Sequence, residues 1–487
     1  MSSTNPNDFK DYQVDYLFLL VGENPLPNYV AARLLIKSTF STVYLVHTTA
    51  TAGKDKPAGL LEKELKKHNI TTKPIPLGDN ESDGDKIRAE IKEAIQPKGK
   101  SPLQGRIGLN YTGGTKAMAV HAYQAFQELQ PTDPVFSYLD SRKLAMHIDG
   151  KDKPIPVDLV LSPAPQLETI LGLHNLKWQE DNLPISKSMF PGAAERFVHL
   201  HTNSSGTSEI WRQWCNKVIQ KAQDKNKGWK PDERIESKLP IKILEEKQSS
   251  IDLPKEIIIS ICNAIKWELD SSQINVQLEK SRDEIKFLKL SKSNESKIIE
   301  IPGDIQEIFR NILKWEFDGK EINIQLVKEK HGFKLSQIYE WLNSGWLEDY
   351  VMWQVEKIAS KYQIQEIKRS LHIQDPEDSS RDQDQFEFDV AFLRGYQLFG
   401  ISCSMTSKHS LCKEKLFEAY LRAKQLGGDE ARVALVSCYE EDTERLKKEI
   451  SFIVQNSKIE VFGKKDLMNA DKFAKKLNLW ILSNAGK

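Results

Sequence analysis

The sequence predicts an α/β protein of three parts whose first third forms a parallel sheet. Three observations lead to this prediction. Strand-like runs alternate with helix-length segments in the first third, a helix–strand unit occurs twice in the middle, and the last third follows the order helix, three strands, helix, strand. A length of 487 residues with 39% hydrophobic content is typical of two or three packed domains.

The first third, residues 1–165, predicts strands separated by helices. Strands are expected at Asp15–Gly22, Ser41–His47 and 105–111, and helices near Asn28–Ser38, Leu60–His68 and Asp85–Ala94, with another helix after Gly114. The run "VFSYLDSRKLAMHID" predicts an added β-hairpin. Strands and helices of these lengths favour a parallel sheet that is covered by helices on both faces.

The middle part, residues 166–335, predicts an α+β connector and assembly domain. "LPKEIIISICNAIKWELDSSQINVQL" from Leu253 matches "IPGDIQEIFRNILKWEFDGKEINIQL" from Ile301. Each unit reads as a proline, a helix with apolar spacing and a strand. Because there are only two copies, we interpret them as a duplicated module and not as a solenoid.

The last third, residues 336–487, begins with a long helical pattern at 336–362. A strand is expected at 364–374, a hairpin at 386–405, a helix at 410–428 and a strand at 432–439. This order of elements predicts a second α/β domain.

Composition points to a protein of the cytoplasm. The five cysteines form no CxxC pair and no even framework, and the chain shows no signal peptide, so we expect reduced thiols. The most apolar runs are too short for a membrane span. The 69 basic and 69 acidic residues cancel, which neither favours nor excludes a nucleic-acid partner.

The stretch "LNYTGGTKAMAVHAYQAF" predicts a strand end, a glycine turn and a helix start. Thr115 is the expected N-cap, and Gly113 and Gly114 leave backbone N–H groups open on one side. The helix N-terminus and Lys116 add positive charge, which favours an anion site. The spacing fits neither a Walker A loop nor G-x-G-x-x-G. A capped turn that holds no ligand is the alternative.

Two other loops, "GENPLPNY" and "HTTATAG", also follow predicted parallel strands. Since ligands of open α/β sheets bind beyond the carboxyl ends of the strands, the three loops are expected to meet. They supply neutral hydrogen-bonding groups and no acidic cluster, which favours a binding module over a catalytic one. The groups are Asn24, Asn28, Thr48, Thr49, Thr51, Thr112 and Thr115.

These three loops resemble those of CARF domains, the Rossmann-like sensors of cyclic oligoadenylate in type III CRISPR systems. The resemblance implies a homodimer that binds cyclic tetra-adenylate or hexa-adenylate across its axis, and a rearrangement of the C-terminal domains on binding. The positions that match the family's ligand-binding loops are Asn24, Pro25, Asn28, Thr48, Thr49, Thr112, Gly113, Gly114, Thr115 and Lys116.

The last third resembles the PD-(D/E)XK, or restriction-endonuclease-like, nuclease domain of CARF effectors. The resemblance implies Mg²⁺ or Mn²⁺ held by Glu348 on the early helix and Asp389 on the second strand. The alternation of "FEFDVAF" predicts Phe386 and Val390 on one face and Asp389 on the other. The plainer interpretation is that Glu348 and Asp389 are solvated charges.

The third strand departs from the family pattern, because Ser402 and Ser404 stand where Glu-x-Lys is expected. A hydroxyl replaces neither the carboxylate charge nor the ammonium. One interpretation moves these groups to the next helix, with Glu418 completing the metal site and Lys413 or Lys415 replacing the lysine. The other is an inactive domain that only binds.

The leading hypothesis is therefore a cyclic-oligoadenylate-activated, metal-dependent nuclease that cuts DNA, RNA or both in type III CRISPR antiviral defence. A non-catalytic, ligand-gated regulatory protein with a degenerate nuclease domain is the alternative. Cleavage of the cyclic ligand by the sensor domain itself is compatible with either hypothesis.

Overall fold

The computed structural model of the chain describes residues 6–157, 161–180, 182–203, 275–281, 284–291, 313, 321–322, 332–333, 337, 340–376, 386–451 and 458–484. Among the helices in these ranges, none combines the length and the apolar character that a membrane crossing requires.

The N-terminal domain contains a seven-stranded sheet in the order β3-β2-β1-β4-β5-β6-β7. The first five of these strands are mutually parallel, and β6 and β7 are antiparallel additions. The predicted hairpin is therefore confirmed as β5 and β6. The strands are β1 (Tyr16–Leu20), β2 (Thr42–His47), β3 (Thr71–Pro76), β4 (Ile107–Asn110), β5 (Val135–Asp140), β6 (Ala145–Ile148) and β7 (Ile155–Pro156).

Helices cover both faces of this sheet, as alternating strands and helices predict. Leu17 and Leu19 of β1 pack in one core with α1 and α2, whereas Phe18 and Leu20 pack in a second core with α3 and α4. Every residue of β1 thus faces helices, which explains its continuous apolar run. The helices are α1 (Leu26–Leu35), α2 (Pro57–Lys66), α3 (Gly84–Ile95) and α4 (Lys116–Leu129), and a 3₁₀ helix, η1 (Pro6–Tyr12), precedes β1.

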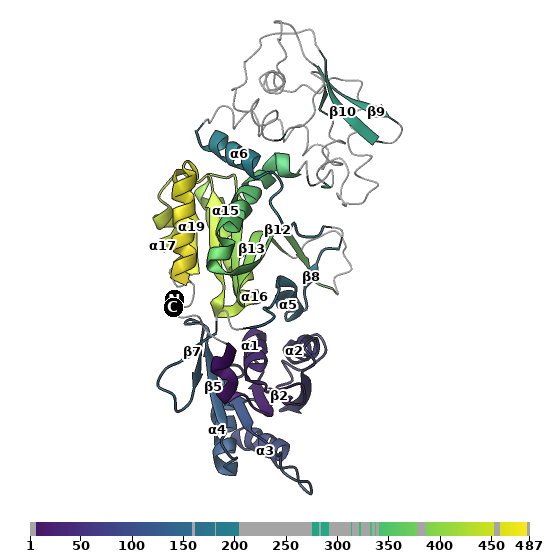
Figure 1. Cartoon of the computed structure of the whole chain (residues 1–487), viewed down its shortest axis with the longest axis vertical. Coiled ribbons are helices and arrows are strands. Elements are labelled where there is room, and N and C mark those ends of the chain that lie inside the picture. The colour runs from purple at the N-terminus through teal and green to yellow at the C-terminus, as the bar shows by residue number, and fades with distance from the viewer. Residues whose placement is uncertain are drawn as a thin grey trace.

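The C-terminal domain contains a six-stranded sheet in the order β16-β15-β14-β13-β12-β8 (Figure 1). Its strands are β8 (Lys177–Trp178), β12 (Ile364–Gln374), β13 (Phe386–Arg394), β14 (Gln397–Ser404), β15 (Arg432–Ser437) and β16 (Ile459–Phe462). Its helices are α15 (Trp346–Tyr362), α16 (His409–Gly427), α17 (Thr443–Ser451), α18 (Lys464–Leu467) and α19 (Ala470–Asn484), with a π-helical turn, η4 (Trp341–Gly345), before α15 and a 3₁₀ turn, η5 (Gly428–Glu430), after α16.

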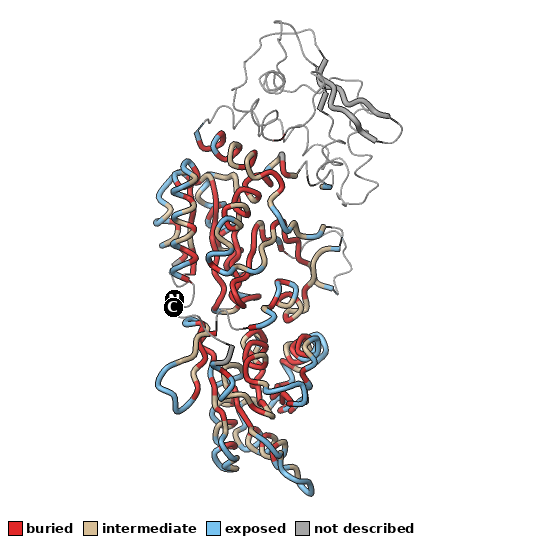
Figure 2. Tube along the Cα trace, in the orientation of Figure 1, coloured by how far each residue is buried: buried red, intermediate tan, exposed pale blue. Residues whose placement is uncertain are grey.

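Residues 166–203, which the sequence assigns to the connector, pack against the C-terminal domain. They form α5 (Leu167–Gly172), β8 and α6 (Pro191–Asn203), and β8 pairs with β12 as the edge strand of the sheet. The helix α5 lies between the N-terminal domain and α16 (Figure 1). One buried core cluster runs through α5 from the first domain into the second, and Figure 2 shows buried segments in both domains.

The described part of the repeat consists of its strands. β9 (Asn275–Ser281) and β11 (Glu321–Ile322), one from each copy, flank β10 (Glu284–Ser291) in an antiparallel three-stranded sheet. Apart from the buried Leu313, the two predicted helices of the repeat lie outside the described residues.

The regular alternation predicted for β13 is wrong at one point. Phe386 and Phe388 belong to the same core cluster as Ala391 and the helix α16, whereas Phe392 stacks on Phe399, which contacts Trp480 of α19. The strand therefore changes faces between Phe388 and Ala391. The change coincides with an interruption of the pairing to the neighbouring strand: β12 pairs with β13 at Arg369–Val390 and at Leu371–Phe388, and the position between them is unpaired in the ladder.

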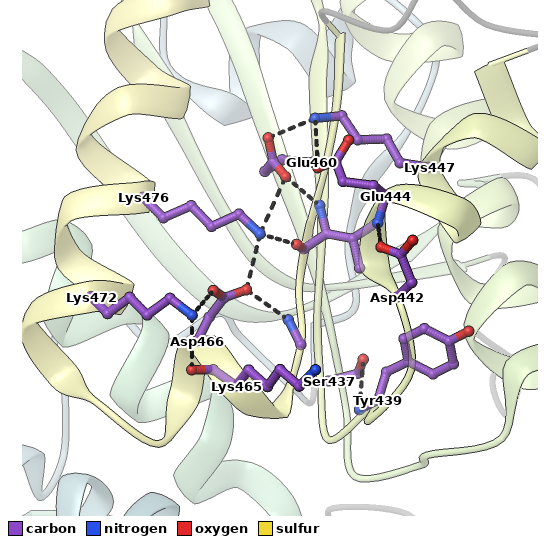
Figure 3. Close-up of polar contacts among 12 residues, drawn as sticks. Ser437, Tyr439, Asp442, Glu444, Lys447, Glu460, Lys465, Asp466, Lys472 and Lys476 are labelled. Atoms are coloured by element: carbon purple, nitrogen blue, oxygen red, sulfur yellow. Dashed lines mark hydrogen bonds and ion pairs between the residues drawn. The ribbon is translucent and has the colours of Figure 1, made fainter.

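A cluster of ion pairs joins the last strand to the last helices (Figure 3). Asp466 accepts hydrogen bonds from the Gly463 N–H at 3.1 Å and from Lys476 Nζ at 2.9 Å, and Lys472 lies 3.5 Å away. Glu460 of β16 pairs with Lys447 of α17 at 3.0 Å. The Asp466 side chain is only 9% exposed, so water screens its ion pairs less than those on the surface.

Asp466→Ala is expected to destabilise the C-terminal domain by about 2 kcal/mol, because it leaves the buried Gly463 N–H without its acceptor and removes a shared ion-pair partner of Lys472 and Lys476. The matched control is Glu440→Ala, which breaks a 2.6 Å pair with Lys464 whose carboxylate is 62% exposed. Exposed pairs contribute roughly 0–1 kcal/mol. Calorimetry should therefore show a fall of a few degrees in melting temperature only for Asp466→Ala; equal shifts in the two variants would contradict the assignment.

Candidate ligand cradle and candidate nuclease site

The predicted ligand loops meet at the topological switch point of the N-terminal sheet. The chain runs from β1 outward to β2 and β3, and then returns to place β4 on the other side of β1. A crevice opens at the carboxyl ends of strands where such a reversal occurs. A Cβ at Gly113 would lie 2.2 Å from the Leu20 carbonyl oxygen, and a Cβ at Gly22 would lie 3.1 Å from Gly114 N. The loops after β1 and β4 therefore touch, and glycine permits the contact.

Four of the predicted ligand residues hold this edge together through their side chains. Asn28 is fully buried and donates to the Leu20 carbonyl at 3.0 Å. Thr112 accepts from Leu139 N at 2.8 Å, and Thr115, the confirmed N-cap of α4, accepts from Met118 N and donates to the Glu81 carbonyl. Thr48 is buried beside Thr51, whose hydroxyl accepts from Thr48 N at 3.1 Å. These hydroxyls and this amide bond to neighbouring groups of the protein and thereby fix the shape of the cradle.

Other members of the set are exposed at the same edge. Thr49, Gly114 and Lys116 are exposed, and Gly114 adopts a φ of 70°, which favours glycine. Lys116 occupies the first turn of α4, where its charge adds to the positive helix terminus. Pro25 is the N-cap of α1, and Asn24 caps the same turn by accepting from Leu26 N at 2.9 Å. Two helix N-termini therefore lie at the crevice.

In the C-terminal domain, β12 links Glu348 and Asp389, which lie 41 positions apart in sequence. Ser370 of β12 bonds Glu348, and its neighbours Arg369 and Leu371 pair with Val390 and Phe388, which flank Asp389. Glu348 comes from the first turn of α15 and accepts from Ser370 Oγ at 2.9 Å. Asp389 comes from β13 and accepts from Ser402 Oγ at 3.0 Å and from Cys403 N at 2.6 Å. The structure thus brings the two predicted metal ligands into one site.

The electrostatics of this pair favour a bound cation. Burial raises the pKa of Glu348 well above its ordinary value, and the charge of Asp389 raises it further, against the lowering effect of Arg369. Burial also raises the pKa of Asp389, while the Cys403 N–H, Lys415 and Ser402 lower it. Two buried carboxylates that repel one another are relieved by a positive charge between them.

The serines of the third strand lie on the side of the sheet that α16 covers, together with Leu398, whose contacts belong to the α16 core. Ser402 binds Asp389, and Ser404 accepts from Thr406 N at 3.3 Å. On α16, Lys415 is near enough for its charge to lower the pKa of Asp389. Lys415 is exposed on α16, and it is the candidate lysine whose charge acts on Asp389.

The other two proposed replacements on α16 have different surroundings. Lys413 pairs with Glu449 of α17 at 3.1 Å, which directs its ammonium to a neighbouring helix. Glu418 is exposed on α16. Of the three candidates, only Lys415 is linked to the carboxylate pair by a described interaction.

Sequence reasoning missed four groups beside the pair. Arg369 and Ser370 of β12 contact Glu348, and His372 of β12 lies 3.6 Å from Glu387 of β13. Glu387 could have been predicted from the sequence, because it stands two residues before Asp389 on the same strand. Arg369 and Ser370 carried no signal, because their roles depend on a helix that is remote in sequence.

The donor set fits one class of cation. Mg²⁺ and Mn²⁺ prefer oxygen ligands, and Mg²⁺ commonly takes one or two carboxylates together with water and substrate phosphate. Glu348 and Asp389 provide such a pair. Among the described residues, no group of three or more His, Cys, Asp and Glu side chains is arranged to hold a metal ion.

Comparisons with known proteins concern the fold and the N-terminal domain. No curated protein matches the sequence. Solved structures do match the fold: protein VC1899 from Vibrio cholerae has a TM-score of 0.57 at 12% identity, over 97% of this chain and 100% of that chain. Can2 from Sulfobacillus thermosulfidooxidans, in complex with cyclic tetra-adenylate, has a TM-score of 0.54 at 14% identity, over 98% and 99%.

A type III CRISPR defence DNA nuclease activated by cyclic oligoadenylate also matches, at 15% identity and a TM-score of 0.45, over 88% of this chain and 46% of that chain. The match to a family model is confined to the N-terminal domain, which contains the seven-stranded sheet and the three candidate ligand loops. Residues 17–154 match the family model of the Card1 CARF domain, so the N-terminal domain is similar to a CARF sensor.

Proposed function

We propose that this protein is a cyclic-oligoadenylate-activated, metal-dependent nuclease of type III CRISPR antiviral defence, acting in the cytoplasm. The observation that carries the proposal is the link between Glu348 and Asp389 through β12, where Ser370 bonds Glu348 and the residues on either side of Ser370 pair with those that flank Asp389. The charge of Lys415 on α16 lowers the pKa of Asp389. Two carboxylates beside a lysine are the groups that metal-dependent phosphodiester hydrolysis needs.

The N-terminal domain is the proposed sensor. The match of residues 17–154 to the Card1 CARF domain supports it, and so does the cyclic tetra-adenylate held by Can2. Backbone N–H groups, two helix N-termini and Lys116 suit the phosphodiesters of a cyclic tetra- or hexa-adenylate. We further propose a homodimer, because Val120 on α4 is 53% exposed and Tyr138 on β5 is also exposed near the crevice.

The C-terminal domain is the proposed nuclease of the PD-(D/E)XK type. When bound by Glu348 and Asp389, Mg²⁺ or Mn²⁺ would activate water and polarise the phosphoryl group. Ser402 and the Cys403 N–H hold one oxygen of Asp389, which orients its carboxylate. Lys415 balances the negative charge that develops on the scissile phosphate of DNA or RNA.

The helix α16 is the proposed link between the two sites. A Cβ at Gly428, directly after α16, would lie 2.4 Å from Asn24 Nδ2, so the ligand loop touches the end of this helix. His174, just after α5, lies 3.0 Å from the Leu426 carbonyl of α16. Because Lys415 belongs to the same helix, a shift of the ligand loop is transmitted to the carboxylate pair.

A non-catalytic, ligand-gated binding protein is the second candidate. Ser402 favours it, because a serine hydroxyl stands where the family has a carboxylate. In that case the ring would still bind at the sensor, and the C-terminal domain would bind nucleic acid without cutting it.

The test is an incubation of the full chain with cyclic tetra- or hexa-adenylate, Mg²⁺ or Mn²⁺, and plasmid, single-stranded DNA or RNA. We expect cleavage of a nucleic acid only when ring and metal are both present. Calorimetry with each ring measures sensor binding separately, and chromatography of the ring detects its own cleavage. Ring binding without nucleic-acid cleavage favours the binding-protein alternative, and absence of ring binding contradicts the sensor.

A further inference from the structure

The backbone of β12 is unusual at Ser370, next to the carboxylate pair. Ser370 has a φ of 51°, in the left-handed region that non-glycine residues avoid. Within the described part of the chain, six other non-glycine residues share a positive φ, and all of them lie in turns, loops or helix ends. Ser370 alone among them lies inside a strand, at the point where the ladder to β13 skips the position of Asp389.

This conformation has a consequence for two consecutive side chains. In a regular strand, Arg369 and Ser370 would project to opposite faces. Here both reach the same carboxylate: Ser370 Oγ donates to Glu348 Oε2 at 2.9 Å, and Arg369 Nη1 lies 3.7 Å from that oxygen. Arg369 Nη1 also donates to Ser370 Oγ at 3.3 Å. The strained residue and its neighbour therefore converge on Glu348.

Arg369 is itself held by a buried network. Its side chain is 1% exposed, and its Nε lies 3.5 Å from Asp349 Oδ1. Asp349 is fully buried and accepts from the N–H groups of Met189 and Phe190 and from Trp341 Nε1 at 2.6 to 2.9 Å. The two consecutive acids therefore have different roles. Asp349 fixes the start of α15, and Glu348 faces Asp389.

We propose that Ser370, with Arg369 behind it, is a positioning residue that holds the Glu348 carboxylate towards Asp389 in a geometry ready for a divalent cation. This inference rests on the proposed function. The left-handed backbone accompanies the delivery of the Ser370 hydroxyl to Glu348 Oε2, and backbone strain of this kind is common at functional sites. Partners that orient a metal ligand typically contribute roughly 10- to 100-fold in metal affinity.

Two substitutions distinguish the effect of the Ser370 hydroxyl from the effect of its strained backbone. Ser370→Ala removes the hydroxyl and keeps a side chain that resists the left-handed backbone, whereas Ser370→Gly removes the hydroxyl and tolerates it. Mn²⁺ binding to the full chain, measured by electron paramagnetic resonance of the free ion, should weaken by roughly tenfold in both variants. Their melting temperatures should differ, with Ser370→Ala lower by a few degrees.

The matched control is Ser188→Ala, which removes a comparable serine–glutamate hydrogen bond of 2.6 Å to Glu356 farther along α15. It should leave Mn²⁺ affinity unchanged. Wild-type Mn²⁺ affinity in both Ser370 variants, or a loss that follows melting temperature and spares Ser370→Gly, would overturn the positioning role alone. Absence of Mn²⁺ binding in the wild-type chain would overturn the positioning role together with the proposed metal site.

Discussion

Asp389→Asn is expected to abolish ring-activated nucleic-acid cleavage, with a loss of roughly 10³-fold or more, while ring binding persists. Asp389 is the proposed metal ligand that Ser402 and the Cys403 N–H orient, and a neutral amide cannot hold the cation with the same strength. Metal-ion catalysis contributes several kcal/mol to transition-state stabilisation, and each 1.36 kcal/mol is a factor of ten. Cleavage assays and calorimetry of ring binding on the same preparation measure the two effects.

The fold should tolerate this substitution well. Burial disfavours the charged form of Asp389 and raises its pKa, so a neutral side chain costs less to bury, and we expect an equal or higher melting temperature. Glu387→Gln is the matched control on the same strand, since Glu387 is a more exposed acid that lies beside His372. It should reduce cleavage by less than about tenfold. Unchanged cleavage in Asp389→Asn would place the active centre elsewhere.

Lys116→Glu is expected to weaken binding of the cyclic oligoadenylate by roughly 10- to 100-fold. The lysine is exposed at the first turn of α4, where helix terminus and ammonium together attract an anion. A hydrogen bond to a charged group contributes about 1.5–3 kcal/mol, which corresponds to this range. Titration of the ring by calorimetry gives the affinity directly.

Lys100→Glu makes the same charge change at an exposed position outside the cradle loops. If ring affinity falls equally in both variants, a general electrostatic effect explains the loss and Lys116 has no specific contact. With saturating ring, Lys116→Glu should cleave nucleic acid at the wild-type rate, because the carboxylate pair and Lys415 are unaltered. A persistent loss at saturation would assign Lys116 a role in activation as well as in binding.

Local patterns in the sequence determined most of the described elements. Apolar runs predicted β1 and β2, and Thr115 was correctly expected to cap α4, because these features depend on neighbours within a few residues. The parallel β1, β2 and β4 also followed from the alternation of strands and helices, whereas β3 was not expected as a strand and β5 was expected only within an added hairpin. The candidate acids Glu348 and Asp389 came from family resemblance, and their role as metal ligands stays a prediction.

Only the tertiary structure decided what these residues face. Asn28 and Thr112 read as ligand groups in the sequence, but their side chains bind the Leu20 carbonyl and Leu139 N, which come from other strands. β8 joins a strand that follows it by almost two hundred residues, and the sequence assigned it to the connector.

The left-handed backbone of Ser370, beside the candidate carboxylate pair, could not be predicted from the sequence either. A serine inside an apparently regular strand carries no mark of a positive φ, because surrounding contacts impose that conformation. Sequence patterns report hydrophobic periodicity and capping, which are local properties. The orientation of a polar side chain depends on which distant group satisfies it, and that partner is set only when the sheets and helices pack.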